Sequence, residues 1–212
     1  MRIAIIGAGN VGGALSAAAV KAGHQVTVTA KNADHAAKVA ADTGATAAES
    51  NEKAAESADV VVLAIPGDVV PEVAAQLKDT VAGKVVVDAT NPLNATFSDL
   101  VIEGVSGGSD LQRRIPQARV VKAFNTILAA RHATPQENGV PLDAYFAGDD
   151  AQAKATVEEL VRSLGYRPVD AGGLRLARAL EEMALLNIVL NAGNGWVWQS
   201  AWQLVGPTDA AQ

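Results

Sequence analysis

Short apolar runs alternate with amphipathic stretches along most of the chain, a pattern typical of α/β proteins. Two runs near the middle, 59–65 and 84–88, are almost continuously apolar, as expected for strands buried on both faces of a parallel sheet. The predicted strands are 3–6, 25–29, 45–48, 59–65, 84–88 and 119–124. The predicted helices between them are 11–21, 34–42, 70–77 and 110–115. This alternation predicts an α/β, doubly wound, mostly parallel sheet with right-handed crossovers.

The last third of the chain repeats the alternation on a smaller scale. Its pattern predicts a βαβα extension with strands 143–147 and 166–170 and helices 151–164 and 174–190. Beyond that, Trp198, Trp202 and Val205 recur at helical spacing, which predicts one more helix with an apolar face. We expect these tryptophans to pack in the core or in a homodimer interface.

The first strand runs into a glycine-rich turn, Gly7-Ala8-Gly9-Asn10-Val11-Gly12, and then directly into an alanine-rich helix. Gly7 suits the tight turn, Gly9 lets a pyrophosphate approach the backbone, and Gly12 lets helix and strand pack closely. The helix N-terminus offers unpaired N–H groups and a positive dipole end to phosphates. The order strand, turn, helix therefore predicts a Rossmann-type dinucleotide-binding domain at 1–127, with the extension at 128–212 packed on it.

The end of the second strand, Thr29-Ala30-Lys31-Asn32, indicates which dinucleotide binds. NAD enzymes usually carry an acid here for the ribose 2′-hydroxyl, whereas this chain carries the cation Lys31. A 2′-phosphate would be attracted to Lys31 and could accept hydrogen bonds from Thr29 and Asn32. Asp34 either reaches the ribose or, as we expect, supplies negative charge to the first turn of the next helix. The strand end therefore predicts NADP(H).

Ligands in such a fold bind beyond the carboxyl ends of the strands, at the switch point of the sheet. The later strand ends contribute Ala64, Ile65 and Pro66; Thr90, Asn91 and Pro92; and Phe124, Asn125 and Thr126. These residues include no nucleophile paired with a base, a composition that fits hydride transfer, where positioning outweighs acid–base strength.

The three histidines are scattered along the sequence, so we expect no metal site. We expect His24 and His35 to be solvated, and His132, in a loop after the Asn125 strand end, to contact a ligand. Lys122 is expected at a strand edge, and Asp88 is expected to bond a neighbouring backbone amide.

The composition limits which partners the protein can bind and in which cellular compartment we expect it. The formal net charge of −6 excludes nucleic acid and anionic membranes as main partners, because both require a basic surface. No run reaches the ~18 apolar residues of a membrane span, and the N-terminal run is too short for a secretory signal. The absence of cysteine excludes disulfides and thiol catalysis. We expect a cytoplasmic homodimer whose partner is a small-molecule hydride acceptor.

Taken together, the motifs resemble those of the deazaflavin (coenzyme F420)-dependent NADP reductases. The resemblance rests on the glycine turn, 88–93 (DATNPL), 120–126 (VVKAFNT) and 170–174 (DAGGL), and it covers nearly the whole chain. The same set is similar to the cytosolic domain of six-transmembrane metalloreductases. This resemblance implies that NADP(H) binds along 7–11 and 29–32, including Ala30, with the nicotinamide near Ile65, Pro66, Asn91 and Pro92.

The resemblance further implies that a flat ring, a deazaflavin or a flavin, stacks on the nicotinamide. Leu93 and Phe124 would contact this ring, and Asn125 and Thr126 would be the catalytic pair. The chain departs from the family twice. It carries Thr29-Ala30-Lys31 in place of Gly-Ser-Arg, which removes the bidentate grip of arginine on phosphate, and Asn125 in place of histidine.

Two other functions stay open at this stage. One is an NADPH-dependent reductase of a small carbonyl or imine, although such enzymes add a larger all-helical domain with a catalytic lysine. The other is a non-catalytic NADP sensor. The fold alone does not distinguish these two functions from hydride transfer to a deazaflavin or flavin.

Overall fold

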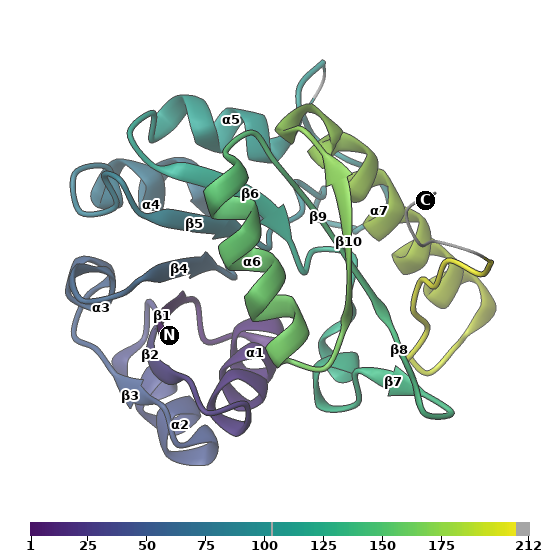
Figure 1. Cartoon of the computed structure of the whole chain (residues 1–212), viewed down its shortest axis with the longest axis horizontal. Helices are drawn as coiled ribbons and strands as arrows, with labels where there is room; N and C mark the ends of the chain where they lie inside the picture. The colour runs from purple at the N-terminus through teal and green to yellow at the C-terminus, as the bar shows by residue number, and fades with distance from the viewer. Residues whose placement is uncertain (103, 207–212) are drawn as a thin grey trace.

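A computed structural model describes residues 1–102 and 104–206, and its centre is one twisted eight-stranded sheet (Figure 1). The strand order is β10-β9-β6-β5-β4-β1-β2-β3. The strands are β1 (Arg2–Ile6), β2 (Gln25–Thr29), β3 (Thr46–Ala47), β4 (Val60–Leu63), β5 (Val85–Asp88), β6 (Arg119–Ala123), β9 (Asp143–Gly148) and β10 (Arg167–Gly172). The chain proceeds outward from β1 through β2 and β3, then crosses to β4 on the other side of β1. This reversal is the switch point of a doubly wound sheet, and the predicted fold class is confirmed.

Helices cover both faces of the sheet. They are α1 (Asn10–Lys21), α2 (Ala33–Thr43), α3 (Asn51–Glu56), α4 (Val70–Leu77), α5 (Gly107–Arg114), α6 (Ala151–Ser163) and α7 (Ala177–Asn194), with short 3-10 turns η1 (Gly67–Val69), η2 (Ala129–Ala133) and η3 (Leu174–Leu176). Alternate residues of β1 point to opposite faces, so Ile3 and Ile5 pack with α1 and α6, whereas Ala4 and Ile6 pack with α3 and α4. No helix in the described part is both long and apolar enough to cross a membrane.

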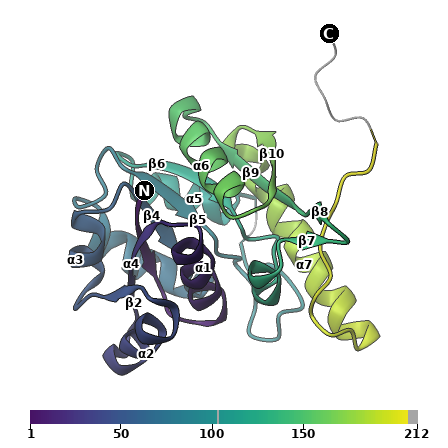
Figure 2. The same cartoon turned by 60° about the horizontal axis from the view of Figure 1, so that its bottom comes forward.

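The described part of the extension, residues 128–206, continues the same sheet through β9 and β10 (Figure 2). Strand β9 pairs antiparallel with β6, and β10 pairs parallel with β9 through the crossover helix α6. Leu160 of α6 and Phe146 of β9 belong to the same core cluster as Ile3 of β1. The division of the chain at residue 127 stays a prediction, because the two parts share a sheet and a core.

The structure contains two elements that the hydrophobic pattern did not predict, helix α3 and the hairpin β7–β8. Helix α3 is only six residues long and buries Ala54 and Ala55, and Ser50 caps its N-terminus by accepting the Lys53 N–H. A small antiparallel hairpin, β7 (Gln136–Glu137) with β8 (Val140–Pro141), is exposed throughout. Neither has a periodic apolar stripe long enough to predict it.

The prediction of a further helix bearing Trp198, Trp202 and Val205 is wrong. Helix α7 ends at Asn194, where Gly195 takes the left-handed conformation (φ 64°) that commonly terminates helices, and the residues from Gly195 to Gly206 are irregular. Trp202 still packs against the molecule and donates its indole N–H to the Met183 carbonyl. Val205 is 94% exposed. The helical spacing of three apolar residues was too weak a signal, because Gly195 ends the helix before them.

The placement of Lys122 at a strand edge is also wrong, because β6 lies inside the sheet and this side chain is fully buried. Its ammonium group lies 3.0 Å from Asp88 Oδ2 and 2.9 Å from Glu181 Oε1, and it donates to the Thr90 carbonyl at 2.6 Å. Burial alone would lower the pKa of Lys122, but the two carboxylates outweigh burial and raise it. The lysine is therefore charged and has three partners.

Each carboxylate of this cluster has further partners of its own. Asp88 accepts the backbone N–H of Thr90, as expected from the sequence, and also its hydroxyl. Glu181 of α7 accepts the N–H groups of Gly107 and Gly108 at the start of α5. The positive end of α5 offsets the excess negative charge of two carboxylates on one ammonium. We call Lys122, Asp88 and Glu181 the buried charge cluster. It ties β5, β6, α5 and α7 together.

Replacing Lys122 with Met would leave two buried carboxylates without their shared cation. We expect Lys122→Met to lower the free energy of unfolding by about 3–5 kcal/mol, measured by urea unfolding. The control is Lys38→Met on the exposed face of α2, whose lysine pairs with Asp42 in solvent, and it should change stability by less than ~0.5 kcal/mol. A Lys122→Met protein as stable as the wild type would contradict the role given to the cluster.

Candidate functional site

The carboxyl ends of four central strands, β1, β4, β5 and β6, surround a cavity of about 420 Å³. Most of the residues predicted from the later strand ends meet there. Twelve predicted site residues line it: Gly9, Asn10, Val11, Ala64, Ile65, Pro66, Thr90, Asn91, Leu93, Phe124, Asn125 and Thr126. Pro92 borders a neighbouring cavity beside α4 and α5, and Ala8 is packed into the core. The structure also adds Phe97, Leu128, Ala184 and Ile188, none of which the sequence singled out.

The glycine turn has the shape that a pyrophosphate requires. Gly7 has φ 111°, and a Cβ on it would collide with the Ala64 carbonyl. A Cβ on Gly12 would collide with the Gly7 carbonyl, so helix α1 packs against the turn at backbone distance. A Cβ on Gly9 would meet no atom within 4 Å. Gly9 also begins α1 without a side-chain cap, which leaves N–H groups of the first turn for an anion.

A second cavity, of about 470 Å³, adjoins the turn and contains Gly7, Thr29, Ala30 and Lys31. Lys31 is exposed on its rim, as a phosphate-binding cation should be. Carboxylates enter the same cavity from Glu52 and Glu72, which the sequence analysis missed because they follow neither a strand end nor a motif. The charge of this cavity is therefore mixed.

Two residues predicted to donate to the 2′-phosphate have other partners. The Thr29 side chain is buried, and its hydroxyl donates to Asn51 Oδ1 at 2.8 Å, so donation to a phosphate would require breaking this hydrogen bond. Asn32 caps α2 by accepting the N–H groups of Asp34 and His35 through its Oδ1. Asp34 lies in the first turn of α2, where its charge favours the helix. Because the cap uses only the Oδ1 of Asn32, its Nδ2 remains a candidate donor to a 2′-phosphate, together with the Lys31 ammonium group.

At the other end of the main cavity, Asn91 and Asn125 hold each other in place. Asn125 Nδ2 donates to Asn91 Oδ1 and to the Leu180 carbonyl, and Asn91 Nδ2 donates to the Asn125 carbonyl, all at 3.0 Å. Within the described part of the chain, Asn125 Oδ1 and Thr126 Oγ1 are buried without a hydrogen-bond partner. Buried polar atoms of folded proteins are nearly always bonded. Arg131 Nε, His132 Nε2 and Asn191 Oδ1 are also without a partner among the described residues, but of these five residues only Asn125 and Thr126 line the main cavity, so these two are suited to bond a ligand there.

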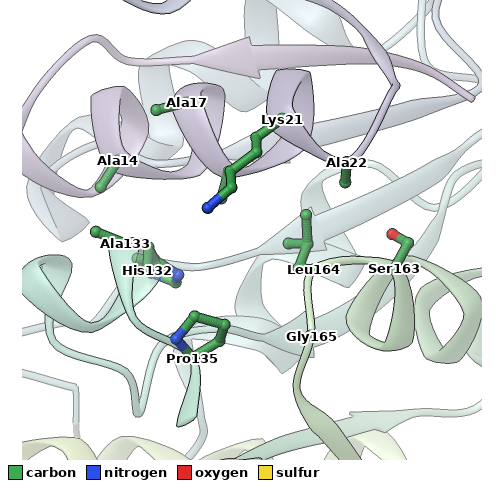
Figure 3. Close-up of a pocket in the computed structure, with 11 residues that line it drawn as sticks. Ala14, Ala17, Lys21, Ala22, His132, Ala133, Pro135, Ser163, Leu164 and Gly165 are labelled. Atoms are coloured by element: carbon green, nitrogen blue, oxygen red, sulfur yellow. The ribbon is translucent and has the colours of Figure 1, made fainter.

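His132 lies apart from this cavity. It borders a different one, of about 380 Å³, between α1, η2 and the end of α6 (Figure 3). The imidazole is 2% exposed, and its Nδ1 lies 3.0 Å from the Tyr166 hydroxyl. Burial lowers the pKa of His132 to about 4, so the ring is neutral near pH 7. The structure therefore does not support His132 as a contact of the predicted acceptor, because the ring packs edge-on against Phe124 from outside the cavity.

The other two histidines differ from each other. His35 is exposed on α2, as expected. His24 is only partly exposed, with Nε2 2.7 Å from the Ser163 hydroxyl, so the expectation that it is solvated holds only in part. In the part of the chain that the structure describes, no three His, Cys, Asp or Glu side chains gather as metal ligands would.

Comparisons with known proteins point to one family. Residues 2–92 match the family model described as NADP oxidoreductase, coenzyme F420-dependent. The chain is 32% identical over 211 residues to the F420-dependent NADP reductase of Methanothermobacter thermautotrophicus, covering 92% of this chain and 90% of that protein.

Two further matches extend this likeness. Metalloreductase STEAP3 of Rattus norvegicus is 30% identical over 185 residues, which are 87% of this chain but only 36% of that larger protein. Among solved structures, a putative F420-dependent NADP reductase from Arthrobacter sp. FB24 superposes with a TM-score of 0.83 at 28% identity, covering 94% of this chain and 97% of that one.

Proposed function

The chain belongs to the family of F420-dependent NADP reductases and is an NADP-dependent oxidoreductase, and we propose that it transfers hydride between NADP(H) and a deazaflavin or flavin-like ring. The observation that carries the proposal is the pair of unpartnered buried oxygens, Asn125 Oδ1 and Thr126 Oγ1, beside a cavity that begins at the glycine turn. They offer hydrogen bonds where two flat rings would need to be aligned.

The residues present fit a bound dinucleotide. The open backbone at Gly9 and the uncapped start of α1 would hold the pyrophosphate, and Lys31 would hold the 2′-phosphate. The nicotinamide, when bound, supplies or receives the hydride. By the same proposal it lies near Ile65, Pro66 and Asn91, all of which line the main cavity.

The protein contributes orientation and exclusion of water. Asn125 cannot rotate freely, because both its amide hydrogens are committed to Asn91 and Leu180, and this directs Oδ1 to serve as an acceptor. A ligand N–H group at this position would complete the bonding of Asn125. Leu93, Phe124 and Ile188 add apolar walls. Holding two reactants in a near-attack geometry supplies much of the rate in a reaction without a strong acid or base.

The C-terminal extension differs from the domain expected of an NADPH-dependent reductase of small carbonyl compounds or imines. Its strands β9 and β10 belong to the main sheet, and no described segment builds the large all-helical domain expected of such reductases. The hydride acceptor we propose is a flat ring, with small ketones and NADP sensing without turnover as the competing outcomes of the assay.

Asn125→Ala tests the proposed site. In a stopped-flow assay of NADPH oxidation with a deazaflavin, FMN, FAD or a simple ketone, we expect wild-type turnover with a ring acceptor only. The variant should slow hydride transfer by about 10- to 100-fold, the loss of one strong hydrogen bond, while the NADPH Kd changes less than ~3-fold.

Asn194→Ala serves as the control, because Asn194 bonds only the exposed turn of α7 at Leu190 among its described contacts. Equal losses of rate and NADPH affinity in Asn125→Ala would move Asn125 into the dinucleotide site. Turnover with ketones alone, or tight NADPH binding without turnover, would refute the proposed reaction.

Lys31→Asp tests the preference for NADP(H). The substitution replaces a phosphate-binding cation with an anion that suits a free ribose 2′-hydroxyl. We expect the NADPH Kd to rise by about 10- to 100-fold and the NADH Kd to fall, measured by fluorescence titration at low salt. Lys38→Asp on α2 changes the charge equally outside the cavity and should leave both constants nearly unchanged. Unchanged NADPH affinity in Lys31→Asp would remove Lys31 from the site.

A homodimer is also part of the proposal, supported by apolar side chains exposed on α7 and just after it: Leu186, Val189, Leu190, Trp196 and Trp198. We expect sedimentation equilibrium to show a dimer that Leu190→Lys weakens and Ala37→Lys, on α2 at the other end of the sheet, does not. A monomer at all concentrations would exclude it. The cytoplasm, where diffusible NADP(H) and acceptor would meet, is the proposed location, and fractionation of the source cells tests it.

A further inference from the structure

One aromatic residue of the main cavity, Phe97, has a position that the fold alone does not explain. It lies in the segment between β5 and α5, and it lines the main cavity together with Phe124 and Ile188. Its side chain is 61% exposed and, among the described residues, belongs to no hydrophobic core cluster. An exposed phenylalanine gains little of the burial energy that normally retains the residue.

The backbone of Phe97 is strained. Its φ is 55°, in the left-handed region, which costs a non-glycine residue roughly 1–2 kcal/mol. Glycine would adopt this conformation freely. Both the exposure of the ring and the conformation of its backbone therefore work against folding, and such features are often tied to function.

The segment nevertheless holds Phe97 in a defined place. Leu93 and Leu100 form an antiparallel bridge, and the N–H of Asn94 donates to the Asp99 carbonyl at 2.9 Å. Inside this loop Asn94 Oδ1 accepts the Ser98 N–H at 2.9 Å, and the Phe97 N–H donates to the Asn94 carbonyl at 3.0 Å. Phe97 is thus at the tip of a closed, hydrogen-bonded turn above the cavity.

The cavity below that tip is walled by flat and aliphatic groups. Leu93 and Phe124 lie on the same lining as Phe97, and the unpartnered Asn125 Oδ1 and Thr126 Oγ1 supply its polar end. A multi-ring heteroaromatic molecule matches this arrangement, because its edge carries polar groups and its face can pack on an aromatic side chain. Aromatic pairs gain about 0.5–1.5 kcal/mol beyond the burial of their area. A small ketone or imine has no such face.

We propose that Phe97 provides an aromatic face for a flat heteroaromatic hydride acceptor and determines the preference for this acceptor class over small carbonyl compounds. The inference rests on the proposed function and adds to it a residue of the acceptor site.

Phe97→Gly is the decisive variant, because glycine removes the ring and relieves the positive φ at once. We expect its Tm to equal or exceed that of the wild type and its NADPH Kd to change less than ~2-fold. Its KM for FMN or a simple deazaflavin should rise by about 5- to 10-fold or more. Phe97→Tyr retains the aromatic face and should stay within ~2-fold of the wild-type KM.

Asn138→Gly is the control for the backbone, because Asn138 is also exposed with positive φ (49°) but does not line the cavity. It should leave the acceptor KM unchanged. A wild-type protein active on ring acceptors whose KM is unaffected in Phe97→Gly overturns the role of Phe97 alone. A wild-type protein that reduces none of the ring acceptors overturns the proposed function and, with it, this inference.

Discussion

The arrangement of the site depends on one buried ammonium group shared by two carboxylates. Lys122 reaches from the centre of the sheet to Asp88 on the neighbouring strand and to Glu181 on α7. A buried cation costs several kcal/mol unless its partners satisfy it fully, and here three oxygens do so. The relative positions of β5, β6, α5 and α7 are therefore fixed by one set of charges, because leaving any of these buried charges without a partner would be costly.

The proposed catalytic residues Asn125 and Thr126 are connected to this cluster through the backbone of its neighbours. Thr90, whose carbonyl binds Lys122, precedes Asn91, and Leu180, whose carbonyl binds Asn125, precedes Glu181. Any shift of β5 or α7 would therefore disturb the mutual bonds of Asn91 and Asn125. The reaction we propose needs alignment of two rings more than a strong acid or base, and a rigid polar support behind the site suits that need.

The contrast between the glycine turn and the other predicted site residues shows which features could be predicted from the sequence. Gly7 and Gly12 allow the close backbone approaches that the motif predicts, because a Cβ on either would collide with a carbonyl group. Thr29 and His132 looked equally suitable, but the Thr29 hydroxyl donates to Asn51, and His132 bonds Tyr166 through Nδ1 and lies outside the main cavity. No sequence pattern indicated that Phe97 lines the cavity, because its position depends on how the loop between β5 and α5 folds.

From the sequence alone, the period of its apolar runs determined the alternating strands and helices, and the glycine turn determined the dinucleotide fold. Both are local properties, since hydrogen bonding and backbone sterics act over a few residues. Only the tertiary structure decided that Lys122 is a buried support and not an edge residue, that α7 stops at Gly195, and that Asn125 and Thr126 are left with unpartnered oxygens at the cavity. The physical reason is that burial and charge pairing depend on residues far apart in the chain, and no periodic pattern records them.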